Sequence, residues 1–88
     1  MTIEEVIDRA VLNGREIEIE YCTRSGRVFT CTICDIEYSR YYGGHYIVAY
    51  RMDIEADRTF KISRIMKVNG HSFSRIFWNQ IGDNFNRI

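Results

Sequence analysis

Several features are scarce or missing in this chain of 88 residues, and each absence excludes a class of protein. The chain has no proline, so proline-rich linkers and X-Pro turns play no part in its architecture. No apolar run reaches the roughly 18 residues that mark a membrane-spanning helix. The first residues, Met1 to Glu5, are acidic, and no basic segment followed by an apolar stretch signals export. The composition, 45% apolar and 27% charged, indicates one globular domain with one core.

Cysteine is too rare for a disulfide framework, since three cysteines cannot all pair within one chain. Together with the missing export signal, this favours a reducing cytoplasm. Cys31 and Cys34 form a lone C-x-x-C pair, and Cys22 with His45 or His71 could complete a set of four zinc ligands. Residues three apart in a strand face opposite sides, however, and these cysteines lie in a strand pattern. We therefore predict free thiols, no metal and no cofactor.

Catalytic motifs are also missing. There is no Walker sequence, no G-x-S-x-G and no H-E-x-x-H. Asp53, Glu55 and Asp57 imitate part of a calcium loop but lack its central glycine and its distal glutamate. No acidic pair lies beside an apolar signal that would raise its pKa for acid–base work. We expect a binding protein and not an enzyme.

Net charge is zero, because twelve basic residues balance twelve acidic ones, so the whole chain is not a general polyanion binder. The charges are distributed unevenly. Residues 1–20 hold six acidic residues and two arginines, whereas residues 58–88 hold six basic residues and one aspartate. Ten of the basic residues are arginines, whose planar guanidinium suits phosphate and stacks on rings. This pattern favours a protein with one basic pole.

The first thirteen residues have the pattern of an amphipathic helix over 2–13. Apolar residues recur there with helical spacing, at Ile3, Val6, Ile7, Ala10 and Val11. Thr2 and Glu5 have the spacing of a capping box, and Gly14 stands where a left-handed C-cap is expected. So short a helix is marginal alone and must pack against something.

After Gly14 the apolar period changes from helical to two, which indicates half-buried strands. The strands are expected at 16–21, 28–36, 45–50, 58–62 and 64–68, with 37–42 a bent or separate continuation of the second. Turns are expected at 23–26, at Gly43-Gly44 and at 53–57. One helix and about five short strands predict a mainly β fold of the α+β class, an antiparallel SH3-like or Sm-like barrel over residues 1–70.

Residues 71–88 depart from this pattern and form an aromatic C-terminal extension. A short helix capped by Ser72 or Ser74 would carry Phe73, Phe77 and Ile81 along one face. Together with Trp78 and Phe85, these are many large apolar groups for so short a segment. They either cover the barrel or form an interface between copies of the chain. An edge strand is the other surface on which a homo-oligomer could form.

Two segments resemble the WYL domain family, named for a Trp-Tyr-Leu triplet. Residues 45–50 read His-Tyr-Ile-Val-Ala-Tyr against the family's W-Y-L-V-A-Y, and residues 58–65 read Arg-Thr-Phe-Lys-Ile-Ser-Arg-Ile against R-x-F-R-L-D-R-I. The upstream helix, an I-x-I-x-Y strand and a hairpin at Gly26 also fit, so the likeness covers roughly residues 3–68. The departures are His45 for Trp, Lys61 for Arg, Ser63 for Asp, and Asp35-Ile36 where a Pro-Tyr pair is common.

This resemblance implies an Sm-like barrel that senses ligands in bacterial transcription regulators and is linked to phage-defence loci. The implied ligands are single-stranded nucleic acids or nucleotides, held on a basic and aromatic surface. The candidate binding residues on this chain are His45, Tyr46, Arg58, Lys61, Arg64 and Arg40. The basic residues would contact phosphates, while His45 and Tyr46 would contact a base.

Each candidate also has a plainer interpretation. Arg58, Lys61 and Arg64 could be solvated cations paired with the acidic residues of the 53–57 turn. Tyr46 could belong to the core, because it shares a strand face with Val48 and Tyr50. The tyrosines around Arg40 could pack across strands and take no part in stacking on a ligand.

Two functional hypotheses follow. The first is a ligand-sensing module that binds single-stranded nucleic acid or a nucleotide and acts in transcriptional or defence regulation through a partner or an oligomer. Its binding should weaken steeply with salt. The second is a protein-interaction or oligomerisation module without nucleic-acid binding, which would use an edge strand or residues 73–85.

Overall fold

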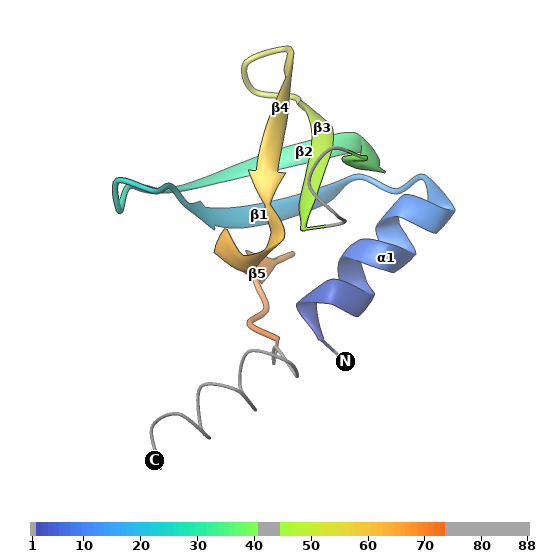
Figure 1. Cartoon of the computed structure of the whole chain (residues 1–88), viewed down its shortest axis with the longest axis horizontal. Coiled ribbons are helices and arrows are strands. Elements are labelled where there is room, and N and C mark those ends of the chain that lie inside the picture. Colours follow the sequence, from blue (N-terminus) through green and yellow to red (C-terminus); the bar gives the residue numbers. More distant parts are fainter. Residues whose placement is uncertain (1, 41–44, 74–88) are drawn as a thin grey trace.

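The computed structural model describes residues 2–40 and 45–73, which form one helix and a five-stranded antiparallel sheet (Figure 1). The elements in chain order are α1 (Ile3–Asn13), β1 (Ile17–Cys22), β2 (Val28–Tyr38), β3 (Tyr46–Arg51), β4 (Ala56–Lys61), a single 3-10 turn η1 (Ile62–Arg64) and β5 (Ile65–Val68). The predicted class, mainly β with one N-terminal helix, is confirmed.

Helix α1 begins and ends at the predicted caps. The Thr2 hydroxyl oxygen accepts the backbone N–H of Glu5 at 3.2 Å, and the hydroxyl lies 3.2 Å from the Glu5 carboxylate. Gly14 ends the helix in the left-handed conformation, with φ 62°, which glycine adopts without a steric penalty. The helix buries Ile3, Ile7 and Ala10, the apolar stripe that its sequence predicts.

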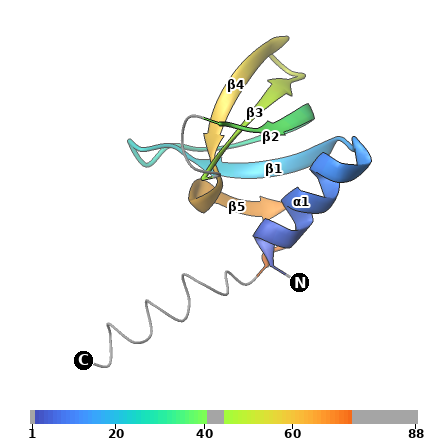
Figure 2. The same ribbon diagram turned by 45° about the vertical axis from the view of Figure 1, so that its right-hand side comes forward.

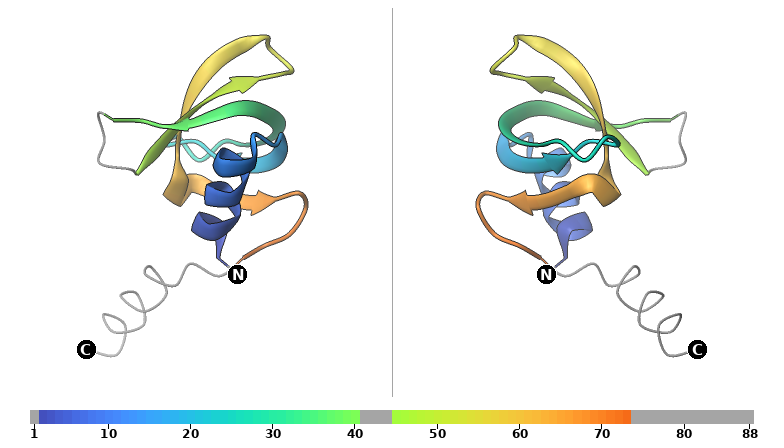
Figure 3. Two further views of the ribbon diagram at one scale, coloured as in Figure 1. Left: turned by 90° about the vertical axis from the view of Figure 1, so that its right-hand side faces the viewer. Right: turned by 90° about the vertical axis from the view of Figure 1, so that its left-hand side faces the viewer.

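The strand order is β4-β3-β2-β1-β5, so β4 and β5 are the two edges of the described sheet. The sheet curls strongly, and η1 leads the chain from one edge strand directly to the other (Figure 3). Helix α1 packs against β2 and β5 and lies across one open end of the curled sheet (Figure 2). The result is a small, partly open barrel with its core between helix and sheet.

The core consists of inward-facing aliphatic side chains with a few aromatic and small residues among them. Its largest fully buried members are Ile3, Ile7, Ile19, Ile33, Ile47, Ile65 and Val68. Phe73, five residues beyond β5, packs against this core, and His71 makes an isolated bridge back to Val68. The described part of the aromatic extension, residues 71–73, thus runs close to the barrel.

Strand β2 runs past residue 36 into the segment 37–42, which is expected as a bent or separate strand, and ends at Tyr38. One extra residue is inserted between Cys34 and Glu37 relative to β3, and Asp35 adopts φ 50° there. This β-bulge bends the strand and reverses its alternation. Cys31 and Ile33 face the core before the bulge, and Ile36 faces it afterwards. The bulge therefore keeps apolar residues turned to the core on both halves of the bent strand.

The boundaries near the C-terminal strands differ from the prediction. The strand expected at 58–62 starts earlier, at Ala56, and ends at Lys61. The strand expected at 64–68 starts at Ile65, because residues 62–64 form η1. Ile62 in that turn and Ile65 at the start of β5 are both buried, and the Ile62 N–H bonds to the His45 carbonyl at 2.9 Å. The turn expected at Gly43-Gly44 lies outside the described residues. The helix expected after Ser72 or Ser74 also lies outside them, apart from residues 72 and 73.

Candidate functional site

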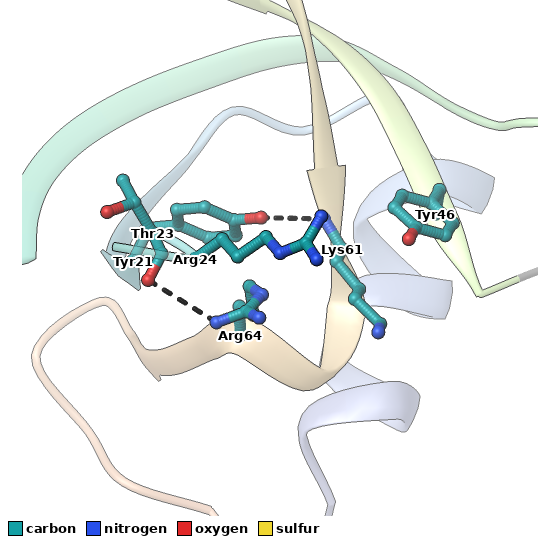
Figure 4. A pocket seen from close by; sticks show the side chains of 6 residues that line it. All are labelled: Tyr21, Thr23, Arg24, Tyr46, Lys61 and Arg64. Atoms are coloured by element: carbon teal, nitrogen blue, oxygen red, sulfur yellow. Dashed lines mark hydrogen bonds between the residues drawn. The ribbon is translucent and has the colours of Figure 1, made fainter. Parts of the chain in front are cut away.

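A polar depression of about 550 Å³ lies where the end of β1, the start of β3 and the junction of β4 with η1 meet. Six residues line it, and Figure 4 shows their side chains: Tyr21, Thr23, Arg24, Tyr46, Lys61 and Arg64. These residues come from three segments that are far apart in the sequence, so the pocket exists only in the folded barrel. We call it the basic pocket.

Tyr21 forms the inner wall of the basic pocket. The period-two pattern of β1 turns its ring inward, where it contacts Phe29 at 5.8 Å and Phe60 edge-on at 5.1 Å between ring centroids. Its hydroxyl oxygen accepts the Lys61 backbone N–H at 2.9 Å (Figure 4). This bond joins residues 40 positions apart and fixes the end of β4 against β1.

Lys61 and Tyr46 face each other across the β3–β4 pairing. The Lys61 ammonium lies 5.9 Å from the centroid of the Tyr46 ring, within range of a cation–π contact. Tyr46 is half-buried, whereas its neighbours Ile47 and Ala49 point into the core. The core interpretation of Tyr46 is therefore not what the fold shows.

Arg64 and Arg24 approach the pocket from two other segments. The single turn of η1 presents Arg64, whose guanidinium donates to the Thr23 carbonyl at 3.3 Å. Arg24 is exposed in the β1–β2 loop. That loop is held by hydrogen bonds from the Arg27 N–H to the Thr23 hydroxyl at 3.0 Å and from the Gly26 N–H to the Thr23 carbonyl at 2.9 Å. The three cations thus stand on fixed backbone.

The charge of the basic pocket is not balanced by a neighbouring acid within the described structure. No aspartate or glutamate lines it, and none of its three cations forms an ion pair with a described residue. Other cations are paired. Arg51 binds Asp53 at 2.7 Å and holds the pKa of that carboxyl below its usual range, and Lys67 lies 3.8 Å from Glu20. The basic pocket therefore offers a ligand three positive charges, the Thr23 hydroxyl and the Tyr46 ring.

The structure brings together three of the six predicted site residues, Tyr46, Lys61 and Arg64. The other three lie outside the pocket lining. Arg58 is exposed on β4 and donates to the Asp57 carbonyl at 2.8 Å; His45 and Arg40 are exposed beside β3 and β2. Their contribution to binding stays a prediction. The acidic turn does not neutralise the pocket, since Lys61 and Arg64 pair with none of its carboxylates.

Sequence reasoning missed Tyr21, Thr23 and Arg24. Tyr21 was visible only as an inward strand residue, and Thr23 and Arg24 only as parts of a turn. The available signal was the residue types, because Thr23 and Arg24 directly follow a strand that carries Tyr21 near its end. Nothing local in that sequence indicates that residues 61 and 64 lie opposite.

The cysteines lie where their strand pattern places them. Cys31 is buried and Cys34 is on the other face of β2, and all three cysteines have free thiols. Burial raises the pKa of the Cys31 thiol, and desolvation together with Asp35 raises that of Cys34. Over the described ranges, no group of three or more histidine, cysteine or acidic side chains is arranged to hold a metal ion.

Comparison with known proteins gives a family and a fold. The family model of the WYL domain matches residues 2–69. Proteasome accessory factor B/C (PafBC) of Arthrobacter aurescens has a similar structure, with a TM-score of 0.60 and 24% sequence identity over 80% of this chain. The match spans 11% of the PafBC chain. A search of curated proteins gave no match. No helix within the described residues is long and apolar enough to cross a membrane.

The family match and the structure agree in extent. The matched residues begin at the N-cap of α1 and end just after β5, so they enclose the whole helix and sheet. They also contain every residue that lines the basic pocket. The chain belongs to the WYL domain family, and this part of it is a ligand-sensing regulatory domain of the kind that the family contributes to transcription regulators.

Proposed function

We propose that this domain senses a single-stranded nucleic acid or a nucleotide by binding it in the basic pocket. One observation carries the proposal: Arg24, Lys61 and Arg64 converge from three segments beside Tyr46, with no carboxylate in the lining. Arginine and lysine bind phosphate oxygens through charge-assisted hydrogen bonds. An aromatic ring offers a face or an edge to a base.

The ligand's effect would be relayed to transcription or to a defence system through a partner or a larger protein. Support for this comes from the family, and from the place of the similar region within PafBC, where it occupies a small part of a longer chain. In this proposal the barrel binds the ligand, and the partner or the larger protein carries the effect to transcription or defence.

Binding can be tested by fluorescence anisotropy with a 12-nucleotide single-stranded DNA labelled at its 3′ end, in 50 mM and 200 mM salt. Unlabelled nucleotides then serve as competitors. If the three cations contact phosphates, the logarithm of the binding constant should fall with the logarithm of salt concentration with a slope of about −2. Absence of binding by both the strand and every nucleotide at low salt would refute the proposed function.

The pocket itself is tested by two variants of one loop. Arg24→Gln removes a cation that lines the pocket, whereas Arg27→Gln removes a cation of the same loop that does not. We expect Arg24→Gln to weaken binding about tenfold and to reduce the magnitude of the salt slope by about 0.7. Arg27→Gln should change binding less than twofold, and equal losses would place the site elsewhere.

Arg58→Gln adds a test of the predicted basic edge of β4. If a bound strand extends along β4 beyond the pocket, this variant should weaken binding of the 12-nucleotide strand more than it weakens binding of a mononucleotide. An equal and negligible effect on both would confine the site to the pocket.

Homo-oligomerisation is a second candidate function, favoured by the two edge strands. Within the described sheet β4 leaves one side unpaired, as does β5 apart from the Val68–His71 bridge, and β5 exposes Met66, which has 47% of its surface accessible. Such edges can pair with another copy of the chain. Sedimentation at several protein concentrations in low and high salt tests this candidate. A monomer at all concentrations would exclude it.

A further inference from the structure

We infer that the ligand of the basic pocket carries two or more contiguous phosphates attached to one base: a nucleoside diphosphate or triphosphate, or the 5′-polyphosphate end of a strand. This inference rests on the proposed function and narrows it. The inference distinguishes a ligand that carries a compact, highly charged polyphosphate from one that offers only the internal phosphodiesters of a nucleic-acid strand.

The first argument concerns charge. Three cationic side chains face one depression of about 550 Å³, and none has an acidic partner among the described residues. Like charges in one pocket repel each other, so an arrangement of this kind is stabilised by an anion of matching charge. An internal phosphodiester brings a single negative charge to one point. A chain of two or three phosphates brings several negative charges within the reach of all three cations.

The second argument concerns the aromatic lining. Proteins that follow a single strand use a series of rings on which successive bases stack. The basic pocket has two rings, and the ring of Tyr21 is packed between Phe29 and Phe60 while its hydroxyl holds the Lys61 backbone. Tyr46, half-buried beside the Lys61 ammonium, is the other ring of the lining. The lining therefore matches one base with several phosphates better than several bases with one phosphate each.

The third argument concerns the backbone that carries the cations. The Tyr21–Lys61 hydrogen bond fixes the end of β4, and the Arg64–Thr23 bond ties η1 to the loop that carries Arg24. The hydrogen bonds of Thr23 fix that loop in turn. Because the backbone segments that carry the cations are held near one another before a ligand arrives, only side chains such as those of Arg24 and Lys61 need ordering to surround a compact anion.

The experiment measures the affinity of the full chain for the mono-, di- and triphosphates of one nucleoside by isothermal titration calorimetry, with EDTA and no magnesium. Two further probes are a 12-nucleotide strand with a 5′-hydroxyl and the same strand with a 5′-triphosphate. We expect each added phosphate to tighten nucleotide binding by about three- to tenfold. The strand probes distinguish a free nucleotide from the 5′ end of a strand as the ligand. Only a site for a strand end should bind the 5′-triphosphate strand more tightly than it binds the free nucleoside triphosphate.

Arg24→Gln should reduce the ratio of triphosphate to monophosphate affinity severalfold, because one phosphate loses its cation. Arg27→Gln is the matched control and should leave this ratio unchanged. Equal affinity for the mono- and triphosphate overturns the inference. So does a 5′-hydroxyl strand that binds more tightly than the triphosphate and gains nothing from its own 5′-triphosphate. If either of these results is found but Arg24→Gln still weakens binding, the inference fails and the proposed function stands. If no probe binds, the inference and the proposed function both fail.

Discussion

Tyr38 joins the far end of β2 to helix α1 through one hydrogen bond, from its hydroxyl to the Asp8 carboxylate at 3.0 Å. Desolvation and this bond raise the pKa of Tyr38 from 10.0 to about 12. Tyr38→Phe should lower the free energy of unfolding at pH 7 by about 1 kcal/mol. Because the folded-state pKa is the higher one, this contribution is present below pH 10 and is lost as pH rises through about 12.

Urea unfolding of the wild type and of Tyr38→Phe at pH 7 and pH 11 measures this loss. The difference in unfolding free energy between the two proteins should be smaller at pH 11 than at pH 7. Absorbance of the tyrosinate at alkaline pH provides an independent readout, since the variant should lack one late-titrating group. The same difference at both pH values would show that the bond to Asp8 does not contribute.

Arg24 shows which part of the site a sequence can reveal. Tyr46, Lys61 and Arg64 were predicted because they lie within family motifs that can be read along the chain. Arg24 joins them because its loop lies beside η1 in the folded barrel, where the Arg64 guanidinium donates to the carbonyl of Thr23, 41 positions away. Contacts between residues so far apart in the sequence depend on how the sheet curls, and no local pattern of residue types encodes them.

The elements themselves were largely predictable from local signals. Thr2 and Gly14 cap α1 as their residue types indicate, and the alternation of glutamates with Ile17 and Ile19 defines β1. The bulge in β2 was not predictable, because Asp35 resembles any polar residue of a strand. The turn η1 was missed for a related reason. Its residues were expected as the end of one strand, 58–62, and the start of the next, 64–68, and no local signal indicated the turn that they form. There the backbone N–H of Ile62 bonds to the His45 carbonyl.

The bulge in β2 makes a prediction at the scale of the element. A β-branched side chain is strained at the positive φ that Asp35 adopts. Asp35→Val should therefore destabilise the protein by about 1–2 kcal/mol, and Asp35→Gly should be nearly neutral. Glu37→Val is the matched control, since Glu37 is an exposed residue of the same strand that pairs normally with Val48. Urea unfolding compares all three, and an Asp35→Val protein as stable as Glu37→Val would contradict the bulge.

At the scale of the whole molecule, the fold and the pocket make opposing demands. The helix and sheet bury an aliphatic core that favours the folded state, while the pocket gathers three cations that have no acidic partner within the described residues. Natural binding sites commonly sacrifice stability in this way. The ligand-free protein should therefore be slightly less stable than a variant in which one of these charges is removed.

Melting temperatures with and without ligand test this balance. Without ligand, Arg24→Gln should melt at the wild-type temperature or a few degrees above it, because repulsion in the pocket falls. A nucleoside triphosphate at one hundred times its Kd should stabilise the wild type by about 2.7 kcal/mol, which for a domain of this size raises Tm by roughly 10–20 °C. At the same ligand concentration, Arg24→Gln should gain less than the wild type. If Arg24→Gln melted several degrees lower and kept the full rise, Arg24 would serve the fold and the cations of the pocket would not be held there for a ligand.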